Sequence, residues 1–179
     1  MPRLNAPNQR GLTLIEVVVV AAIVAILAAL FLPNFLAWLN NRRVANGLAR
    51  VQGAFQEAQR QAIRTGVNCV VNLTTGTNGS LTSSTNCLPT GNRSLGEDSG
   101  FLGNLQASLQ LRSSVASITF DKNGFPTGLG GTFVIALPGS GAQQKCFVIS
   151  NAVGLMRSGD YLSSDTTGAN PSNCTTAQL

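Results

Sequence analysis

The chain has 179 residues, of which 44% are hydrophobic and 11% are charged, and its formal net charge is +5. This hydrophobic content excludes an intrinsically disordered protein, and a charged fraction far below the roughly 25% of ordinary soluble domains indicates that part of the apolar content serves something other than a globular core. The chain contains no histidine, which excludes His-based general-base catalysis, His-dependent triads and histidine-containing metal sites.

The N-terminal segment begins with a short basic stretch, residues 1–11, and continues into an apolar segment. Residues 17–32 form an uninterrupted run of sixteen apolar residues, and Glu16 stands at its start. A helix over residues 12–32 is about 31 Å long, which matches a hydrocarbon core of roughly 30 Å. We therefore predict a membrane helix. A buried core helix and a cleaved secretory signal are the alternatives, but the chain has little interior for such a run, and a signal has a shorter apolar region.

The helix is predicted to continue to about Thr65, with an amphipathic second half. Apolar residues recur there at spacings of three and four, which places them on one helix face: Val44, Leu48, Val51, Phe55, Ala58 and Ala62. Residues 42–64 carry a net charge of +4, whereas the chain from residue 65 onward is neutral. Gly66 is expected to end the helix. Pro33 removes a backbone donor and is expected to cause a kink or local melting.

β-Strands are predicted after Gly66, where the helical periodicity gives way to alternation and short β-prone runs. The predicted strands cover residues 67–73, 118–120, 132–137 and 145–150. A turn is expected at residues 121–124, and Pro138-Gly139-Ser140-Gly141 is typical of a hairpin loop. Two stretches rich in Ser, Thr, Asn and Gly, 74–86 and 163–173, are expected to be exposed loops. The amphipathic helix half can cover one face of an antiparallel sheet, so the predicted fold class is α+β.

The four cysteines are Cys69, Cys87, Cys146 and Cys174, and they have no C-x-x-C spacing. Without that spacing and without histidine, they do not predict a zinc site. Four cysteines allow three connectivities, of which we favour the local pairs Cys69–Cys87 and Cys146–Cys174, because these would tether the two loop-rich stretches. Two disulfides imply an oxidising, extracytoplasmic compartment. Four buried thiols are the alternative.

The segment Arg10-Gly11-Leu12-Thr13-Leu14-Ile15-Glu16, followed at once by the apolar run, resembles the N-terminus of type IV prepilins and pseudopilins. The resemblance implies that a prepilin peptidase cuts between Gly11 and Leu12 and that the new Leu12 amine is N-methylated. The first mature residue in this superfamily is most often Phe or Met, from which Leu12 departs. The resemblance also implies that Glu16 pairs with the N-terminal amine of a neighbouring subunit and that Pro33 is the helix-breaking proline common in pilins.

The position of Glu16 supports the same interpretation on physical grounds. A carboxylate inside a membrane helix costs about 2.5–3.5 kcal/mol near the bilayer centre and less near an end, so it requires a partner. The alternative is a glutamate that rests at the level of the lipid headgroups. Charge does not give the orientation, because arginines flank the apolar segment on both sides. The prepilin resemblance implies that the C-terminal domain lies outside the cytoplasm, and the expected disulfides support that side.

A second resemblance covers residues 118–161, which are similar to the core of the GspH/FimT group of minor pilins and pseudopilins. That group has a Phe-x-x-x-Gly turn, two strands and a terminal Gly-Arg-x-Arg segment, through which some members bind DNA. Here the terminal segment reads Gly154-Leu155-Met156-Arg157, so only the second arginine is present. DNA affinity rests mainly on clustered Lys and Arg, so DNA contact by Arg157 and Lys145 requires that these residues, with Lys122, come together in space.

These observations predict a pilin fold in which the long helix packs on an antiparallel β-sheet domain. The expected organisation is a cleaved cytoplasmic leader at 1–11, a transmembrane and filament-core helix at 12–39, an amphipathic helix half at 40–65, and an extracytoplasmic β-rich domain at 66–179. The sequence predicts no catalytic residues, no cofactor and no metal site, so we expect a structural protein rather than an enzyme.

The predicted function is that of a GspH/FimT-like minor pilin or pseudopilin in a type IV pilus or a type II secretion pseudopilus. A major type IV pilin and a DNA-receptor minor pilin for natural transformation are the alternatives. The expected partners are the prepilin peptidase, other pilin or pseudopilin subunits, the inner-membrane assembly platform, and membrane lipid before assembly; DNA is a less favoured partner. The expected location is the bacterial inner membrane, as a single-pass protein, and then the pilus or pseudopilus.

Overall fold

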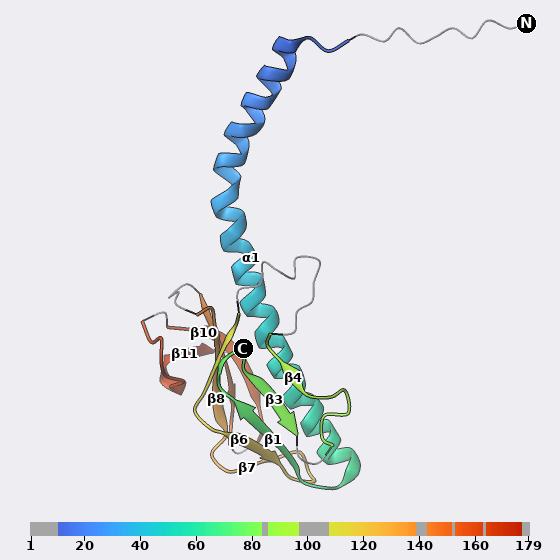
Figure 1. Cartoon of the computed structure of the whole chain (residues 1–179). Helices are drawn as coiled ribbons and strands as arrows, with labels where there is room; N and C mark the ends of the chain where they lie inside the picture. The colour runs from blue at the N-terminus through green and yellow to red at the C-terminus, as the bar shows by residue number, and fades with distance from the viewer. Residues whose placement is uncertain are drawn as a thin grey trace, which may run out of the picture. The chain divides into compact units, whose positions relative to one another are not determined.

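The computed structural model describes residues 11–83, 86–96, 108–138, 143–151, 153–162 and 164–176, and of Leu32 and Pro33 it describes the backbone alone. The chain divides into two compact units, Met1–Leu39 and Asn40–Leu179. Helix α1 (Leu14–Thr65, 52 residues) contributes to both units and is drawn from blue to green in Figure 1. It ends where the sequence predicted, at Gly66, whose φ of 68° breaks the helical conformation.

In the first unit, residues 14–39 form the N-terminal part of α1 and residues 11–13 precede it. Its segment Leu14–Phe31 has a mean hydropathy of 3.0 and is long and apolar enough to cross a membrane. The large apolar side chains here are exposed, from 48% for Leu27 to 82% for Leu14. The helix continues through Pro33 without interruption, so the expected local melting is wrong. One proline removes one hydrogen bond, and the helical turns on both sides hold the backbone.

In the second unit, the strands form two antiparallel sheets. The five-stranded sheet has the order β4-β3-β1-β6-β7, with β1 Cys69–Thr74, β3 Ser80–Ser83, β4 Arg93–Ser94, β6 Ser117–Phe120 and β7 Pro126–Thr127. The six-stranded sheet has the order β11-β10-β9-β8-β5-β2, with β2 Gly76–Thr77, β5 Gln110–Ser113, β8 Gly131–Ala136, β9 Gln144–Ile149, β10 Met156–Tyr161 and β11 Cys174–Thr176.

The apolar face of α1 forms one side of the core of this unit. All six residues of the predicted stripe are buried, with exposed fractions of 8% for Leu48 and 1% or less for the other five. The Phe55 ring lies against Phe120 of the five-stranded sheet and against Phe133 and Phe147 of the six-stranded sheet. The helix therefore holds the two sheets together through one aromatic side chain. These contacts confirm the predicted α+β fold class and the amphipathic pattern.

Several predicted β elements are confirmed with small shifts. Strand β1 begins two residues later than predicted, and β8 and β9 pair antiparallel as a hairpin; residues 139–142 of its loop lie outside the described residues. The turn at 121–124 is confirmed by the bond from the Gly124 amide to the Asp121 carbonyl at 2.9 Å. The Asp121 carboxylate fixes the turn further, because it accepts bonds from the amides of Asn123 and Phe125 at 2.9 and 2.8 Å.

The prediction of an exposed loop over residues 74–86 is wrong. This stretch contains β2 and β3, and β3 pairs with β1 on one side and with β4 on the other. Leu81 is 1% exposed, and it anchors a strand whose other residues are Ser and Thr. Ser and Thr are compatible with an extended backbone, so pairing with β1 and β4 makes this segment a strand. The stretch 163–173 lacks strands in its described part and contains a short 3-10 helix, Pro171–Asn173.

Candidate functional site: the start of helix α1 and the outer face of the six-stranded sheet

The predicted processing site lies directly before helix α1. Gly11 is exposed and a Cβ there would meet no atom within 4 Å, and Leu12 is 76% exposed. Thr13 caps the helix: its carbonyl accepts bonds from the amides of Glu16 and Val17 at 3.1 and 3.3 Å, and its hydroxyl accepts from the Glu16 amide at 3.4 Å. The bond between Gly11 and Leu12 is therefore accessible and outside the helical hydrogen bonding.

The role of Thr13 was missed by the sequence analysis, although the signal for it is present. Thr13 and Glu16 have the S/T-x-x-E spacing of a capping box, in which the threonine side chain binds an orphan amide of the first helical turn. The same spacing places the Glu16 carboxylate beside the positive end of the helix dipole. Glu16 thus lies in the first turn of α1, where a negative charge is favoured.

Glu16 also lines an open groove along one side of the first unit. The groove has a volume of ≈ 560 Å³, and its other lining residues are apolar: Leu12, Val17, Val20, Ala21, Val24, Ala25 and Ala28. These residues follow two adjacent rows at spacings of four, which form neighbouring ridges on a helix surface. The alanines keep the floor low, so a second helix can approach closely. Such a surface suits helix–helix packing, with a carboxylate at one end that can fix the register.

Two parts of the predicted site lie outside the described residues. These are the leader up to Arg10 and the side chain of Pro33. The predictions for the leader and for a role of Pro33 in assembly therefore remain expectations.

The cysteines form two disulfides, and the pairs are those favoured from the sequence. Cys69 of β1 is bonded to Cys87, with a Cα–Cα distance of 5.6 Å, and Cys146 of β9 is bonded to Cys174 of β11, with a Cα–Cα distance of 5.8 Å. The first bond ties the segment after β3 to the five-stranded sheet. The second ties the C-terminal segment to the six-stranded sheet across the intervening strand β10.

A buried arginine on the outer face of the six-stranded sheet was not predicted. Arg112 of β5 is 6% exposed. One guanidinium nitrogen, Nη1, donates to the Asp165 carbonyl at 3.0 Å, Nη2 donates to the Gln144 side chain, and the group lies 5.5 Å from the centroid of the Tyr161 ring. The Tyr161 hydroxyl donates to Asp165 Oδ2 at 2.5 Å. This bond and the amides of Gly168 and Thr167 hold the pKa of Asp165 well below its usual range.

This cluster holds the C-terminal segment over the sheet. Asp165 accepts four hydrogen bonds from within the segment and from Tyr161, and it forms an ion pair of 4.0 Å with Arg112. Arg112 therefore contributes to the structure of the domain. The sequence carries no local signal for it, because Asp165 lies 53 residues away from Arg112.

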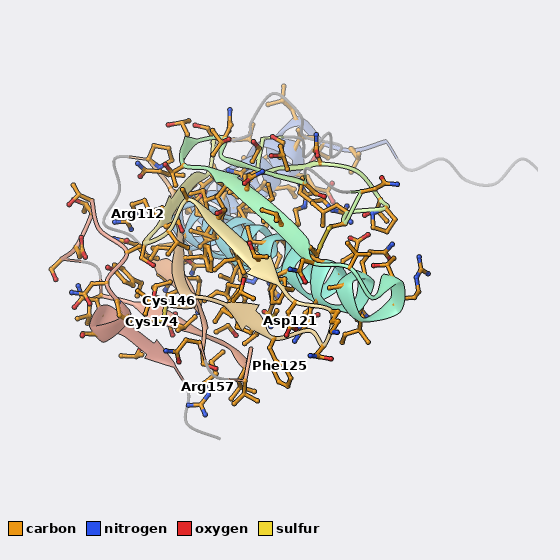
Figure 2. The ribbon with its side chains drawn as sticks, turned by 90° about the horizontal axis from the view of Figure 1, so that it is seen from below. Arg112, Asp121, Phe125, Cys146, Arg157 and Cys174 are labelled. Atoms are coloured by element: carbon orange, nitrogen blue, oxygen red, sulfur yellow. A yellow bond between two sulfur atoms is a disulfide. The ribbon has the colours of Figure 1, made fainter. Side chains whose placement is uncertain are left out.

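The two candidate DNA-contact residues do not lie together. Arg157 is opposite Val148 and Lys145 is opposite Asp160 in the β9–β10 pairing. Because side chains alternate along a strand, this register places Arg157 and Lys145 on opposite faces of the sheet. Lys145 forms an ion pair with Asp160. Arg157 is exposed, and Figure 2 shows it at the edge of the domain, apart from Arg112. The structure thus forms no basic cluster from these two residues.

Two family models match the chain. A family model for the prokaryotic N-terminal methylation motif matches residues 6–32, and a family model for type II transport protein GspH matches residues 48–153. The chain belongs to the GspH family. Members of this family are structural subunits of the pilin and pseudopilin type, so this GspH-family chain is not an enzyme.

Among solved structures, two crystal forms of the type IV minor pilin FimU from Pseudomonas aeruginosa resemble the GspH-family chain. The first shares 18% identity, covers 72% of this chain and 95% of FimU, and has a TM-score of 0.48. The second shares 18% identity, covers 68% of this chain and 94% of FimU, and has a TM-score of 0.44. A search of curated proteins finds no match.

Proposed function

We propose that this GspH-family chain is a minor structural subunit of a type IV pilus or of a type II secretion pseudopilus. The observation that carries the proposal lies in the first unit: the capped segment Leu14–Phe31 of α1 has exposed apolar side chains throughout, with Glu16 in the first helical turn. Leaving such side chains in water costs about 1.5–3 kcal/mol for each large residue, so the segment requires a bilayer or other helices around it.

In this proposal the prepilin peptidase cuts after Gly11, and the methylated Leu12 amine becomes the start of the mature chain. The helix resides in the inner membrane until the assembly platform adds the subunit to a filament. Lipid is as apolar as leucine, so transfer from lipid to a helix bundle gains little from hydrophobicity and depends on close packing and on polar partners. The alanines of the groove permit close packing, and the pairing of Glu16 with a neighbour's terminal amine supplies the polar partner.

The proposed orientation places the second unit outside the cytoplasm. Its two disulfides, Cys69–Cys87 and Cys146–Cys174, support this orientation because disulfides form and persist in oxidising compartments. Arginines flank the apolar segment on both sides, so the excess of positive charge that marks the cytoplasmic side of a membrane helix does not give the orientation.

The decisive experiment is mass spectrometry of the mature N-terminus of the protein isolated from its own membranes. We expect a chain that begins at methylated Leu12. The variant Gly11→Leu should stay at the precursor mass, because a bulky side chain replaces the residue at which the peptidase cuts. A precursor mass for the wild-type chain, or a mature product from Gly11→Leu, would contradict the proposed processing.

The role of Glu16 is tested by incorporation into filaments. Glu16→Ala should insert into the membrane at wild-type levels but be depleted from sheared filaments. The matched control, Asp160→Ala, removes an exposed carboxylate from the second unit and should leave incorporation unchanged. Normal incorporation of Glu16→Ala would show that charge pairing is dispensable. A wild-type chain that forms the bulk of sheared filaments would contradict the minor-subunit assignment.

A further inference from the structure

The second unit carries a basic surface groove that the packing of the helix and the sheets does not explain. It runs along the polar side of α1, beside β4 and the segment that precedes it, which Figure 1 shows next to the helix. Its volume is ≈ 570 Å³, and we call it the arginine groove; it is lined by Gly53, Glu57, Arg60, Gln61, Arg64, Pro89 and Arg93.

The single carboxylate of the arginine groove is already used. Glu57 accepts bonds from the Thr90 amide at 3.2 Å, from the Thr90 hydroxyl at 2.8 Å and from Arg93 Nη2 at 3.1 Å. Burial opposes ionisation of Glu57, but the bonds from Thr90 and Arg93 outweigh it and lower its pKa. Glu57 therefore fixes Arg93 at the rim of the groove, and its charge is already paired with that of Arg93.

Arg60 and Arg64 form no ion pair with any carboxylate in the described part of the chain. Arg60 Nε donates to the Gln56 carbonyl at 3.2 Å, which orients its side chain along the helix. The other described carboxylates of the second unit have local partners: Asp121 in its turn, Asp160 with Lys145 and Asp165 with Arg112. Among the described residues, no carboxylate therefore neutralises Arg60 or Arg64, and both side chains line the groove.

Gly53 gives the arginine groove an open floor. A glycine in the middle of a helix is destabilising relative to alanine. No packing contact requires it here, because a Cβ at Gly53 would meet no atom within 4 Å, whereas a Cβ at Gly47 of the same helix would lie 2.6 Å from Leu109 Cδ1. Gly47 is thus explained by the core and Gly53 is not. Its missing side chain leaves space at the surface, next to the basic residues.

The length of the arginine groove favours a chain segment over a single anion. Gly53 and Arg64 are eleven residues apart, which corresponds to about 16 Å along a helix and to roughly five residues of extended chain. We propose that the arginine groove binds an acidic peptide segment of a different subunit of the filament. This inference rests on the proposed function for the identity of the partner, since a minor subunit has other subunits as neighbours.

The test uses the full-length protein in a non-ionic detergent and a fluorescein-labelled hexaglutamate peptide, with binding followed by fluorescence anisotropy. Arg60→Gln/Arg64→Gln should weaken binding on the order of tenfold, because it removes two charged donors from the groove. The matched control, Lys122→Gln/Arg157→Gln, removes two exposed charges elsewhere and should leave binding within about twofold of the wild type, since distant surface charges are screened.

A second pair of variants tests the groove without a change of charge. Gly53→Leu places a side chain over the floor and should weaken binding about as much as loss of the two arginines, on the order of tenfold. Asn46→Leu introduces the same side chain at an exposed position of α1 outside the lining, about 10 Å along the helix from Gly53, and should have no effect. Thermal unfolding of each variant is measured alongside, so that a loss of binding through a loss of fold is recognised.

Three results would overturn the proposal. The first is equal weakening by the two charge pairs, which would indicate general attraction to a basic protein. The second is unchanged binding in Gly53→Leu. The third is displacement of the peptide by inorganic phosphate as effectively, per charge, as by unlabelled peptide, which would indicate a simple anion site. None of these bears on N-terminal methylation, so a failure of the arginine groove and a failure of the proposed function are distinguishable.

Discussion

Phe55 is the side chain of α1 whose ring contacts aromatic residues of both sheets in the second unit. It is fully buried, and its ring centroid lies 4.8 Å from that of Phe133, 5.8 Å from Phe147 and 6.4 Å from Phe120. Phe55→Ala is expected to lower the free energy of unfolding by about 3–5 kcal/mol. We expect the upper half of this range, because each aromatic pair adds about 0.5–1.5 kcal/mol to the effect of buried area. For a domain of this size the midpoint of thermal unfolding should fall by roughly 10–15 °C.

The assay is thermal unfolding of the full-length protein, with its disulfides oxidised, followed by near-ultraviolet circular dichroism. The matched control is Phe125→Ala, which removes the same ring from a side chain that is 46% exposed. The control should change the free energy of unfolding by no more than about 0.5 kcal/mol. Equal shifts for the two variants, or a shift below about 4 °C for Phe55→Ala, would refute the conclusion that Phe55 joins the helix to both sheets.

Three further predictions concern the sheets and the C-terminal segment. Cys146→Ser/Cys174→Ser should lower the free energy of unfolding by about 3–4 kcal/mol, as expected for closing a loop of 28 residues, and should make the C-terminal segment the first site of limited proteolysis. The pKa of Asp165 is lower in the folded protein than in the unfolded chain, where it is about 3.9. Its ionised form therefore stabilises the fold fully above that pH, and this stabilisation is lost as the pH falls below it. Asp165→Asn should therefore reduce the fall of the unfolding midpoint at acid pH, measured by thermal unfolding over a range of pH. Gly130→Ala should lower the free energy of unfolding, measured with denaturant, by at least about 2 kcal/mol, because the φ of Gly130 is +54° and the new Cβ would lie 2.2 Å from the Ile149 carbonyl oxygen. The control Gly128→Ala should lower it less, because a Cβ there would meet no atom within 4 Å.

The elements that the sequence predicted well are those whose signal is local. The burial of the stripe from Val44 to Ala62 follows from helical periodicity, because a helix that repeats its apolar residues every three or four positions has one face to bury. The turn after β6 follows from Asp121 and Gly124, which carry its hydrogen bonds and its positive φ. The fold class could therefore be reached without knowledge of the strand order.

The elements that the sequence missed depend on distant partners. Strand β10, Met156–Tyr161, is polar along most of its length and forms because β9 and β11 bind it on both sides. The burial of Arg112 depends on residues brought together by the sheet. The grouping of Lys145 with Arg157 failed for a related reason: which face a side chain occupies is decided by strand register, and register cannot be deduced from the net charge of a segment.

Helix α1 has a consequence for how the protein can be divided or inserted. Its buried residues from Val44 to Ala62 are interior residues of the same unit as all the strands. A protease or a truncation that separates the apolar segment from the strands at Gly66 would remove one wall of the core, whereas a cut near Asn40 would leave that wall in place. If the apolar segment spans a membrane, as proposed, residues 44–62 lie on the same side of it as the strands, because they form part of the same core. The boundary between the two units therefore falls inside a continuous helix. In the proposed orientation, export of the second unit is complete only when the part of α1 that belongs to it has been exported as well.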